Sequence, residues 1–107
     1  MFRRLLQCLF GDKLEGRSPC WLQVRAEHLK QNPICVCCGT DDDLEVHHLK
    51  PFWLYHDLEC DPCNLRTVCR DHHFLVGHGM DWKAWNPAFD SDARYIREMI
   101  AKRKYGR

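Results

Sequence analysis

Apolar side chains recur at helical spacing between residues 18 and 33. Ser18 predicts the cap of a helix and Pro19 its first turn, where the missing N–H of proline costs nothing. Asn32-Pro33 predicts the end of this helix, because proline disfavours helical geometry in the residue before it. We expect the helix to pack on the rest of the domain through Trp21, Val24, His28 and Leu29.

Two short segments in the middle of the chain have the pattern of strands. Leu44-Glu45-Val46 alternates like a half-buried strand, and His47-His48 ends it. A second strand is expected at residues 65–68. From Arg70 the sequence predicts a helix that stops at Gly77, because glycine favours helix ends.

The last part of the chain combines a tryptophan-rich segment with a basic helix. Trp82 and Trp85 are expected to anchor the segment to the domain, with base stacking as the less favoured alternative. The helix is expected to begin near Asp90-Ser91 and to end in the basic run 102–107, which suits the helix dipole and can also contact a DNA backbone. Its expected apolar face consists of Ala93, Ile96 and Ile100.

Composition places this pattern in one small domain with many possible metal ligands. A chain of 107 residues has an apolar core that is often marginal on its own. Eight cysteines and seven histidines can add stability to this core through cross-links or metal ligation. Their Cys-x-x-Cys and Cys-x-x-His spacings indicate zinc more than disulfides. Residues 35–75 are acidic and both flanks are basic. The acidic centre suits a cation, and the flanks are either phosphate contacts or ordinary solvated charge.

The first ten residues do not predict a targeting or membrane segment. Met1–Phe10 contains a short apolar run, but Gln7 interrupts it and no small-residue cleavage site follows. The run is also too short to span a bilayer. Together with zinc-type cysteine spacing, this pattern predicts a soluble protein of the reducing cytoplasm, with no membrane partner.

One set of four residues has the spacing of a structural zinc site. Its first half comes from a Cys-x-x-Cys turn followed by Gly39, which can take the positive φ that such a turn often needs. Its second half is a Cys-x-x-His pair at the junction of the second strand and the following helix. The expected ligands are Cys35, Cys38, Cys69 and His72.

Other cysteines leave part of this assignment open. Cys60-x-x-Cys63 can replace the Cys-x-x-His pair and give an all-cysteine centre. Against this alternative, the Cys-x-x-His pair would fix the orientation of its neighbour, His73. Cys37 lies between the first two ligands and is expected to point away as a small apolar residue.

The order of these residues resembles that of the HNH endonuclease family. The resemblance rests on the Cys-x-x-Cys turn, the histidine pair 47–48, Asn64, and the Cys-x-x-His-His that ends at His73. The short flanking helices look like those of small stand-alone bacterial and phage members. The resemblance implies an α+β fold, a small zinc-stapled ββα-metal finger with flanking helices. The implied single domain of residues 1–107 has a helical flank at 1–34, a core at 35–78 and a C-terminal segment at 79–107.

The same resemblance assigns roles in an active site. His48 matches the general base that takes a proton from the attacking water. His47 and His73 match residues that hold one divalent cation, such as Mg²⁺, Mn²⁺, Ni²⁺ or Zn²⁺, against the scissile phosphate. Asn64 matches the central asparagine, which either orients the loop that carries His48 or completes the metal shell.

Three more positions flank the expected site. Lys50 and Arg66 can contact DNA phosphates. His78 lies five residues after His73, a poor offset for a shared helical face. It ranks first as a packing histidine and second as a third metal ligand.

The implied function is metal-dependent hydrolysis of DNA phosphodiester bonds to 5′-phosphate and 3′-hydroxyl ends. One chain holds one site, so a monomer is expected to nick; the oligomeric state stays open. No base-reading module is visible in the sequence, which predicts low sequence selectivity. Small relatives are often phage-encoded and act with packaging or restriction partners. The competing function is a non-catalytic zinc module that binds nucleic acid or protein, which would not need the histidine pair and Asn64 together.

Overall fold

A computed structural model describes residues 17–105 of the chain. The expectations for Met1–Phe10 and for the last two residues of the basic run lie outside the described residues. Within the described range, none of the helices combines the length and apolar character needed to cross a membrane.

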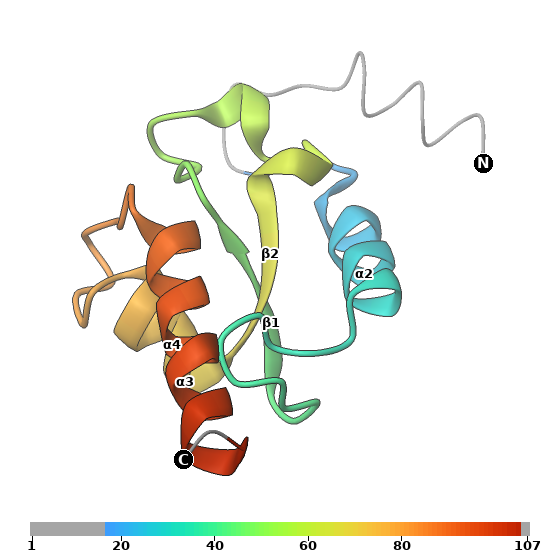
Figure 1. The fold of residues 1–107 in the computed structure, drawn as a ribbon. Helices are drawn as coiled ribbons and strands as arrows, with labels where there is room; N and C mark the ends of the chain where they lie inside the picture. The colour runs from blue at the N-terminus through green and yellow to red at the C-terminus, as the bar shows by residue number, and fades with distance from the viewer. Residues whose placement is uncertain (1–16, 106–107) are drawn as a thin grey trace.

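The architecture is α+β, as the sequence predicts, with helices on both sides of one two-stranded antiparallel sheet (Figure 1). Strand β1 (Leu44–His48) pairs with strand β2 (Leu65–Cys69), which confirms both expected strands. Helix α2 (Trp21–Gln31) lies on one side of this strand pair. Helices α3 (Arg70–His72) and α4 (Phe89–Tyr105) lie on the other side.

The connections contain three short helical turns. The loop after β1 contains the 3₁₀ turns η1 (His56–Leu58) and η2 (Pro62–Asn64), which lead into β2. After α3 the chain continues as a π-helical turn, η3 (His73–Gly77). This turn packs against β1, so residues that follow β2 in sequence come next to residues of β1.

Helix α2 begins later than the sequence predicts. Ser18 does not cap it, because the helix starts at Trp21 and its N-cap residue, Cys20, makes no side-chain cap. The Ser18 hydroxyl instead accepts the Cys20 N–H at 3.2 Å, and the Ser18 N–H donates to Glu59 Oε1 at 2.7 Å. Ser18 therefore joins the start of α2 to a buried carboxylate. The predicted helix end is confirmed, since α2 stops at Gln31.

Two apolar clusters hold the layers together. The smaller lies between α2 and the sheet and consists of Trp21, Val46 and Leu65. The larger joins the other side of the sheet to η3 and α4; its buried members are Cys35, Cys37, Val68, Cys69, Val76, Phe89 and Ala93.

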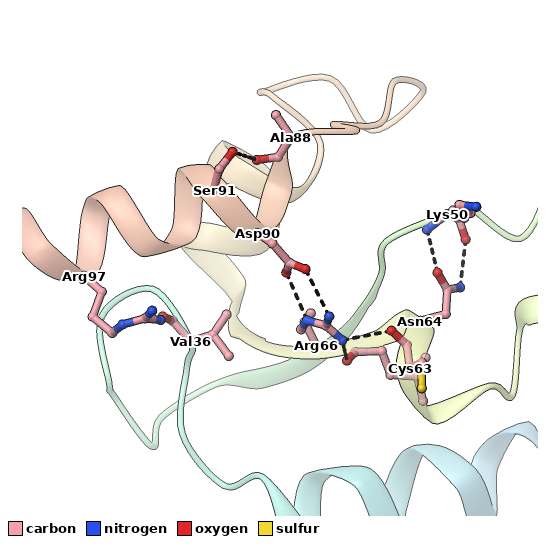
Figure 2. Close-up of polar contacts among 10 residues, drawn as sticks. Val36, Lys50, Cys63, Asn64, Arg66, Ala88, Asp90, Ser91 and Arg97 are labelled. Carbon is pink, nitrogen blue, oxygen red and sulfur yellow. Dashed lines mark hydrogen bonds and ion pairs between the residues drawn. The ribbon is translucent and has the colours of Figure 1, made fainter.

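Two arginines fasten helix α4 to the rest of the domain, as Figure 2 shows. The Arg66 guanidinium on β2 donates two hydrogen bonds to the Asp90 carboxylate, each at 3.0 Å. Arg97 donates to the Val36 carbonyl at 2.8 Å. Helix α4 begins at Phe89, close to the predicted start, and buries Ala93 as expected.

Candidate metal centres

The structure brings together the four residues expected to hold zinc. Their ligand atoms all lie within 4.8 Å of one another. The Cys38 and Cys69 sulfurs are 3.9 Å apart, and His72 Nδ1 lies 3.2 Å from Cys69 Sγ. Three sulfurs and one imidazole nitrogen form a common tetrahedral zinc donor set. This cysteine-histidine cluster, which can hold a metal such as zinc, consists of Cys35, Cys38, Cys69 and His72.

Local hydrogen bonds stabilise thiolate in part of this cluster. The Cys37 N–H lies 3.4 Å from Cys35 Sγ, and the His72 N–H lies 3.5 Å from Cys69 Sγ. The hydrogen bond between the Cys37 and Cys35 side chains lowers the pKa of Cys35 and raises that of Cys37. Burial raises the pKa of Cys69, and the neighbouring sulfurs add to this rise. A bound cation would allow these crowded thiols to ionise together, so the donor set fits a metal.

The alternative all-cysteine centre is not formed within residues 17–105. Cys60 packs against the apolar cluster under α2, and Cys63 is exposed. Neither contributes to the cysteine-histidine cluster. Cys37 is fully buried in the larger apolar cluster, in keeping with its expected role as a small apolar residue.

A second group of possible ligands lies where η3 meets β1. This histidine cluster consists of His47, His73 and His78, whose ligand atoms also lie within 4.8 Å of one another. The His47 ring centroid is 5.2 Å from each of the other two, and the Nε2 atoms of His73 and His78 are 3.3 Å apart. The structure therefore joins the two expected cation ligands and adds a third.

Hydrogen bonds orient two of these rings. His73 Nδ1 lies 2.8 Å from the Glu45 carboxylate, and His78 Nδ1 lies 2.8 Å from the Ala84 carbonyl. Both oxygens accept hydrogen bonds, so each Nδ1 is the donor, and on a neutral ring Nε2 then carries a lone pair. The two Nε2 atoms face each other, and a shared cation or proton would relieve the repulsion of their lone pairs. Carboxylate or carbonyl support of this kind is typical of metal-binding histidines.

His47 supplies independent support for a cation. Its side chain is 1% exposed, and neither ring nitrogen finds a hydrogen-bond partner among residues 17–105. Burial lowers the pKa of His47 to about 3, so the ring is neutral at physiological pH. An unpaired buried polar group costs about 1–3 kcal/mol. Metal ligation would offset this cost.

The π-helical turn explains why His78 joins the cluster. The His78 N–H bonds to the His73 carbonyl at 3.1 Å, so residues five apart come together. Gly77 makes the approach possible, because a Cβ at this position would lie only 2.9 Å from His47 Nδ1. The lower rank that the sequence gives to His78 as a ligand comes from assuming α-helical spacing, which a π turn does not follow.

His48 lies beside the histidine cluster in a different environment. Its Nε2 is 2.9 Å from the Glu59 carbonyl, and its ring packs 4.6 Å from the Trp21 ring. The carbonyl can only accept, so Nε2 is the donor and Nδ1 carries the lone pair on the neutral ring. Burial lowers the pKa of His48 to about 4, which keeps the neutral form dominant near pH 7.

One cavity connects His48 with the histidine cluster. It has a volume of about 240 Å³. Although neighbouring side chains of a regular strand point to opposite faces, His47 and His48 both line it at the end of β1. The remaining lining residues are Arg17, Val46, Pro51, Phe52, Trp53, His73, His78 and Trp82.

Asn64 supports the loop after β1. Its Oδ1 accepts the Lys50 N–H at 2.8 Å, and its Nδ2 donates to the Lys50 carbonyl at 3.1 Å, as Figure 2 shows. The same Nδ2 also donates to the Leu58 carbonyl at 3.1 Å. The side chain is buried, and its amide makes these three bonds to the loop. Of the two roles that the sequence leaves open, the geometry favours orientation of the loop.

The two residues expected to contact DNA have different surroundings. Lys50 is exposed, and its ammonium lies 5.4 Å from the Tyr55 ring centroid. The Arg66 guanidinium donates hydrogen bonds within the protein, to the Asp90 carboxylate and to the carbonyls of Cys63 and Leu65. The sequence gives no sign of this engagement, because Asp90 lies 24 positions away.

In comparisons with protein-family models, curated proteins and solved structures, the chain has no match. The structure offers a closed cluster of four ligands, an open cluster of three, and a neutral histidine on the cavity of the second.

Proposed function

We propose that the protein is a metal-dependent nuclease of the HNH type that hydrolyses DNA phosphodiester bonds. The observation that carries this proposal is that His48, with Nδ1 as its lone-pair nitrogen, lines the same cavity as the histidine cluster. A general base and a cation site that share one cavity can activate water beside a bound phosphate. The chain order β1, β2, α3 around the ligands supports assignment to the ββα-metal finger.

His48 acts as the general base. A water proton passes to His48 Nδ1, while Nε2–H keeps its bond to the Glu59 carbonyl and so stabilises the imidazolium that forms. The water oxygen forms a bond to phosphorus, and the bond from phosphorus to the 3′ oxygen breaks. The 3′ oxygen takes a proton from solvent, and His48 releases its proton afterwards. The products are a 5′-phosphate and a 3′-hydroxyl.

The histidine cluster would hold one divalent cation through imidazole nitrogens of His47, His73 and His78. When bound, such an ion supplies Lewis-acid stabilisation of the charge on the phosphate and on the leaving oxygen. Glu45 keeps His73 in its tautomer and orientation. Arg17, which is held by its ion pair with Glu59, adds a positive charge to the cavity lining.

The cysteine-histidine cluster would hold zinc as a structural ion. Four protein ligands leave no position for water or substrate, as is usual for structural zinc. Because His72 and His73 are neighbours, ligation of His72 would also fix the start of the π turn that carries His73.

Plasmid cleavage by wild-type and His48→Ala proteins tests this function. We expect the wild type to nick supercoiled plasmid with Mg²⁺, Mn²⁺ or Ni²⁺ and to stop when EDTA is added. Loss of a general base typically lowers kcat about 100- to 10,000-fold, so His48→Ala should nick slowly while binding the cation as before in calorimetry. His56→Ala is the matched control, because His56 is exposed and outside both clusters.

Two outcomes contradict the proposal. A wild-type protein that shifts plasmid on a gel but cleaves it with none of these metals would be a zinc module that only binds nucleic acid. A His48→Ala protein as active as the wild type would remove His48 from the mechanism.

A further inference from the structure

Two tryptophans border the cavity that contains His48 and the histidine cluster. Trp53 and Trp82 line this cavity, yet each is 48% exposed. Singly exposed apolar side chains are common on proteins. Two large aromatic rings at the edge of one candidate reaction site are more informative, because each offers ring surface next to the place where a phosphate would bind.

The structure holds the Trp82 ring in place and fixes the backbone of the turn that carries Trp53. Trp82 packs at ring-centroid distances of 5.1 Å from His73 and 4.8 Å from His78. Trp53 belongs to the turn after Pro51, whose carbonyl accepts the N–H groups of Leu54 at 3.1 Å and Tyr55 at 2.9 Å. Asn64 fixes both ends of the same loop through its bonds to Lys50 and Leu58. Ordering the Trp82 ring on binding therefore costs little entropy, and the fixed loop backbone lowers the cost for Trp53.

The charged part of the cavity lining is a cation that is paired with a buried carboxylate. Among its described lining residues, the cavity has the cation Arg17 and no carboxylate. The Arg17 guanidinium lies 4.9 Å from the ring centroids of Trp21 and Phe52, and its ion pair with the buried Glu59 carboxylate holds it there. A cation that lines the same cavity as two exposed aromatic rings matches the alternation of phosphate and base along an unpaired strand.

We propose that Trp53 and Trp82 form a stacking surface for unpaired bases next to the scissile phosphate, so that the substrate is single-stranded DNA or an unpaired region. In a regular duplex the base faces are covered by their neighbours, and only the base edges are open to the grooves. Ring stacking therefore requires bases that are out of the duplex. This inference rests on the proposed nuclease function, because it names the substrate class of the same site.

Binding by the His48→Ala protein tests the stacking surface without cleavage. The probes are a fluorescein-labelled single strand of about 16 nucleotides, the upper site size of a small single-strand-binding fold, and the same strand annealed to its complement. We expect tighter binding of the single strand in anisotropy titrations, with quenching of tryptophan fluorescence. Adding Trp53→Ala should weaken single-strand binding about 5- to 150-fold, the loss expected for one stacked base.

Three further variants distinguish the loss of ring stacking from a general change in the folded structure. Trp53→Phe should recover most of the affinity, because it keeps a ring. Tyr95→Ala removes an aromatic side chain that is 64% exposed on α4 and should change nothing. Trp82→Ala should also weaken binding, although Trp53 gives the cleaner result because Trp82 contacts the histidines. A strand with abasic sites should bind the Trp53→Ala and parent proteins equally.

Some results would overturn the proposal. Equal or tighter binding of the duplex would point to a groove-binding mode, with the tryptophans as wedges or bystanders. Unchanged affinity of Trp53→Ala and Trp82→Ala, relative to Tyr95→Ala, would exclude stacking. If the wild-type protein cleaves neither probe while the single-strand preference and the tryptophan effects persist, the nuclease function fails and the stacking surface stands. If it cleaves the duplex and both tryptophan variants stay fully active, the stacking proposal fails alone.

Discussion

The two clusters differ in donor chemistry and in access, although both are drawn from residues 35–78. The cysteine-histidine cluster has four donors, three of them sulfur, and two of its cysteines are among the buried core residues. The histidine cluster has three nitrogen donors and opens on a cavity of about 240 Å³. Closed four-ligand sites stabilise small folds, whereas three-ligand sites leave a position for water or substrate. The number of ligands and the access to solvent therefore distinguish the cysteine-histidine cluster, a candidate structural site, from the histidine cluster, a candidate reaction centre.

His72 and His73 are neighbours in sequence but belong to different clusters. Successive side chains on a helix diverge by about 100°, so the two imidazoles turn to different clusters. His72 Nδ1 faces the Cys69 sulfur, while His73 Nδ1 faces the Glu45 carboxylate. A single peptide bond thus connects the two clusters. Disorder at His72 would therefore displace His73 as well.

The largest expected effect is the loss of folding in Cys38→Ser. Zinc binding contributes about 10–16 kcal/mol in zinc-finger peptides, which is as large as the whole stability of a typical domain, about 5–15 kcal/mol. We expect Cys38→Ser to lose its zinc and its cooperative thermal transition. The measurements are metal content of the purified protein and melting followed by circular dichroism.

A matched change in the histidine cluster tests whether the two clusters really differ. The His73→Ala protein should keep its zinc and its melting transition, because His73 does not belong to the cysteine-histidine cluster. It should lose metal-stimulated cleavage. An unchanged melting temperature in Cys38→Ser, or unfolding in His73→Ala, would contradict the separation of roles. Cys63→Ser is the control for a cysteine outside both clusters, since Cys63 is exposed.

The sequence predicts the cysteine-histidine cluster and the strands because both follow short, regular spacings. Cys-x-x-Cys and Cys-x-x-His pairs carry their geometry within one turn, and the first strand is marked by the apolar-polar-apolar alternation of Leu44-Glu45-Val46. The final helix is found for the same reason, through its apolar face.

Other features depend on geometry that no local pattern contains. His78 reaches the cluster through a π turn and the missing side chain of Gly77. Ser18 donates its N–H to Glu59 instead of capping α2, and Arg66 donates to Asp90, 24 positions away. These outcomes are decided by long-range packing, which spacing rules for regular helices and strands do not represent.

An intermediate effect is expected when Glu45 is changed to Gln. The variant keeps an oxygen near His73 Nδ1 but loses the charge that makes the imidazole a stronger ligand. Loss of such a supporting group typically costs about 10- to 100-fold in metal affinity. Calorimetric titration with Mn²⁺ or Ni²⁺ measures this loss, and the zinc content should not change. Arg70→Ala is the control, since it removes the other ionic partner of Glu45; a loss of affinity as large as that in Glu45→Gln would refute direct support of His73.

The smallest effects should separate Arg66 from Lys50, the two basic residues that the sequence predicts as DNA contacts. Arg66→Ala removes the two hydrogen bonds to the Asp90 carboxylate. It should lower the free energy of unfolding by about 1 kcal/mol, the upper end for exposed ion pairs. Because the guanidinium is already engaged, the salt dependence of DNA binding should stay the same. Lys50→Ala should leave stability unchanged and reduce the slope of log Kd against log salt by about 1. Urea unfolding and salt titrations measure the two effects, and a reversed pattern would make Arg66 the phosphate contact.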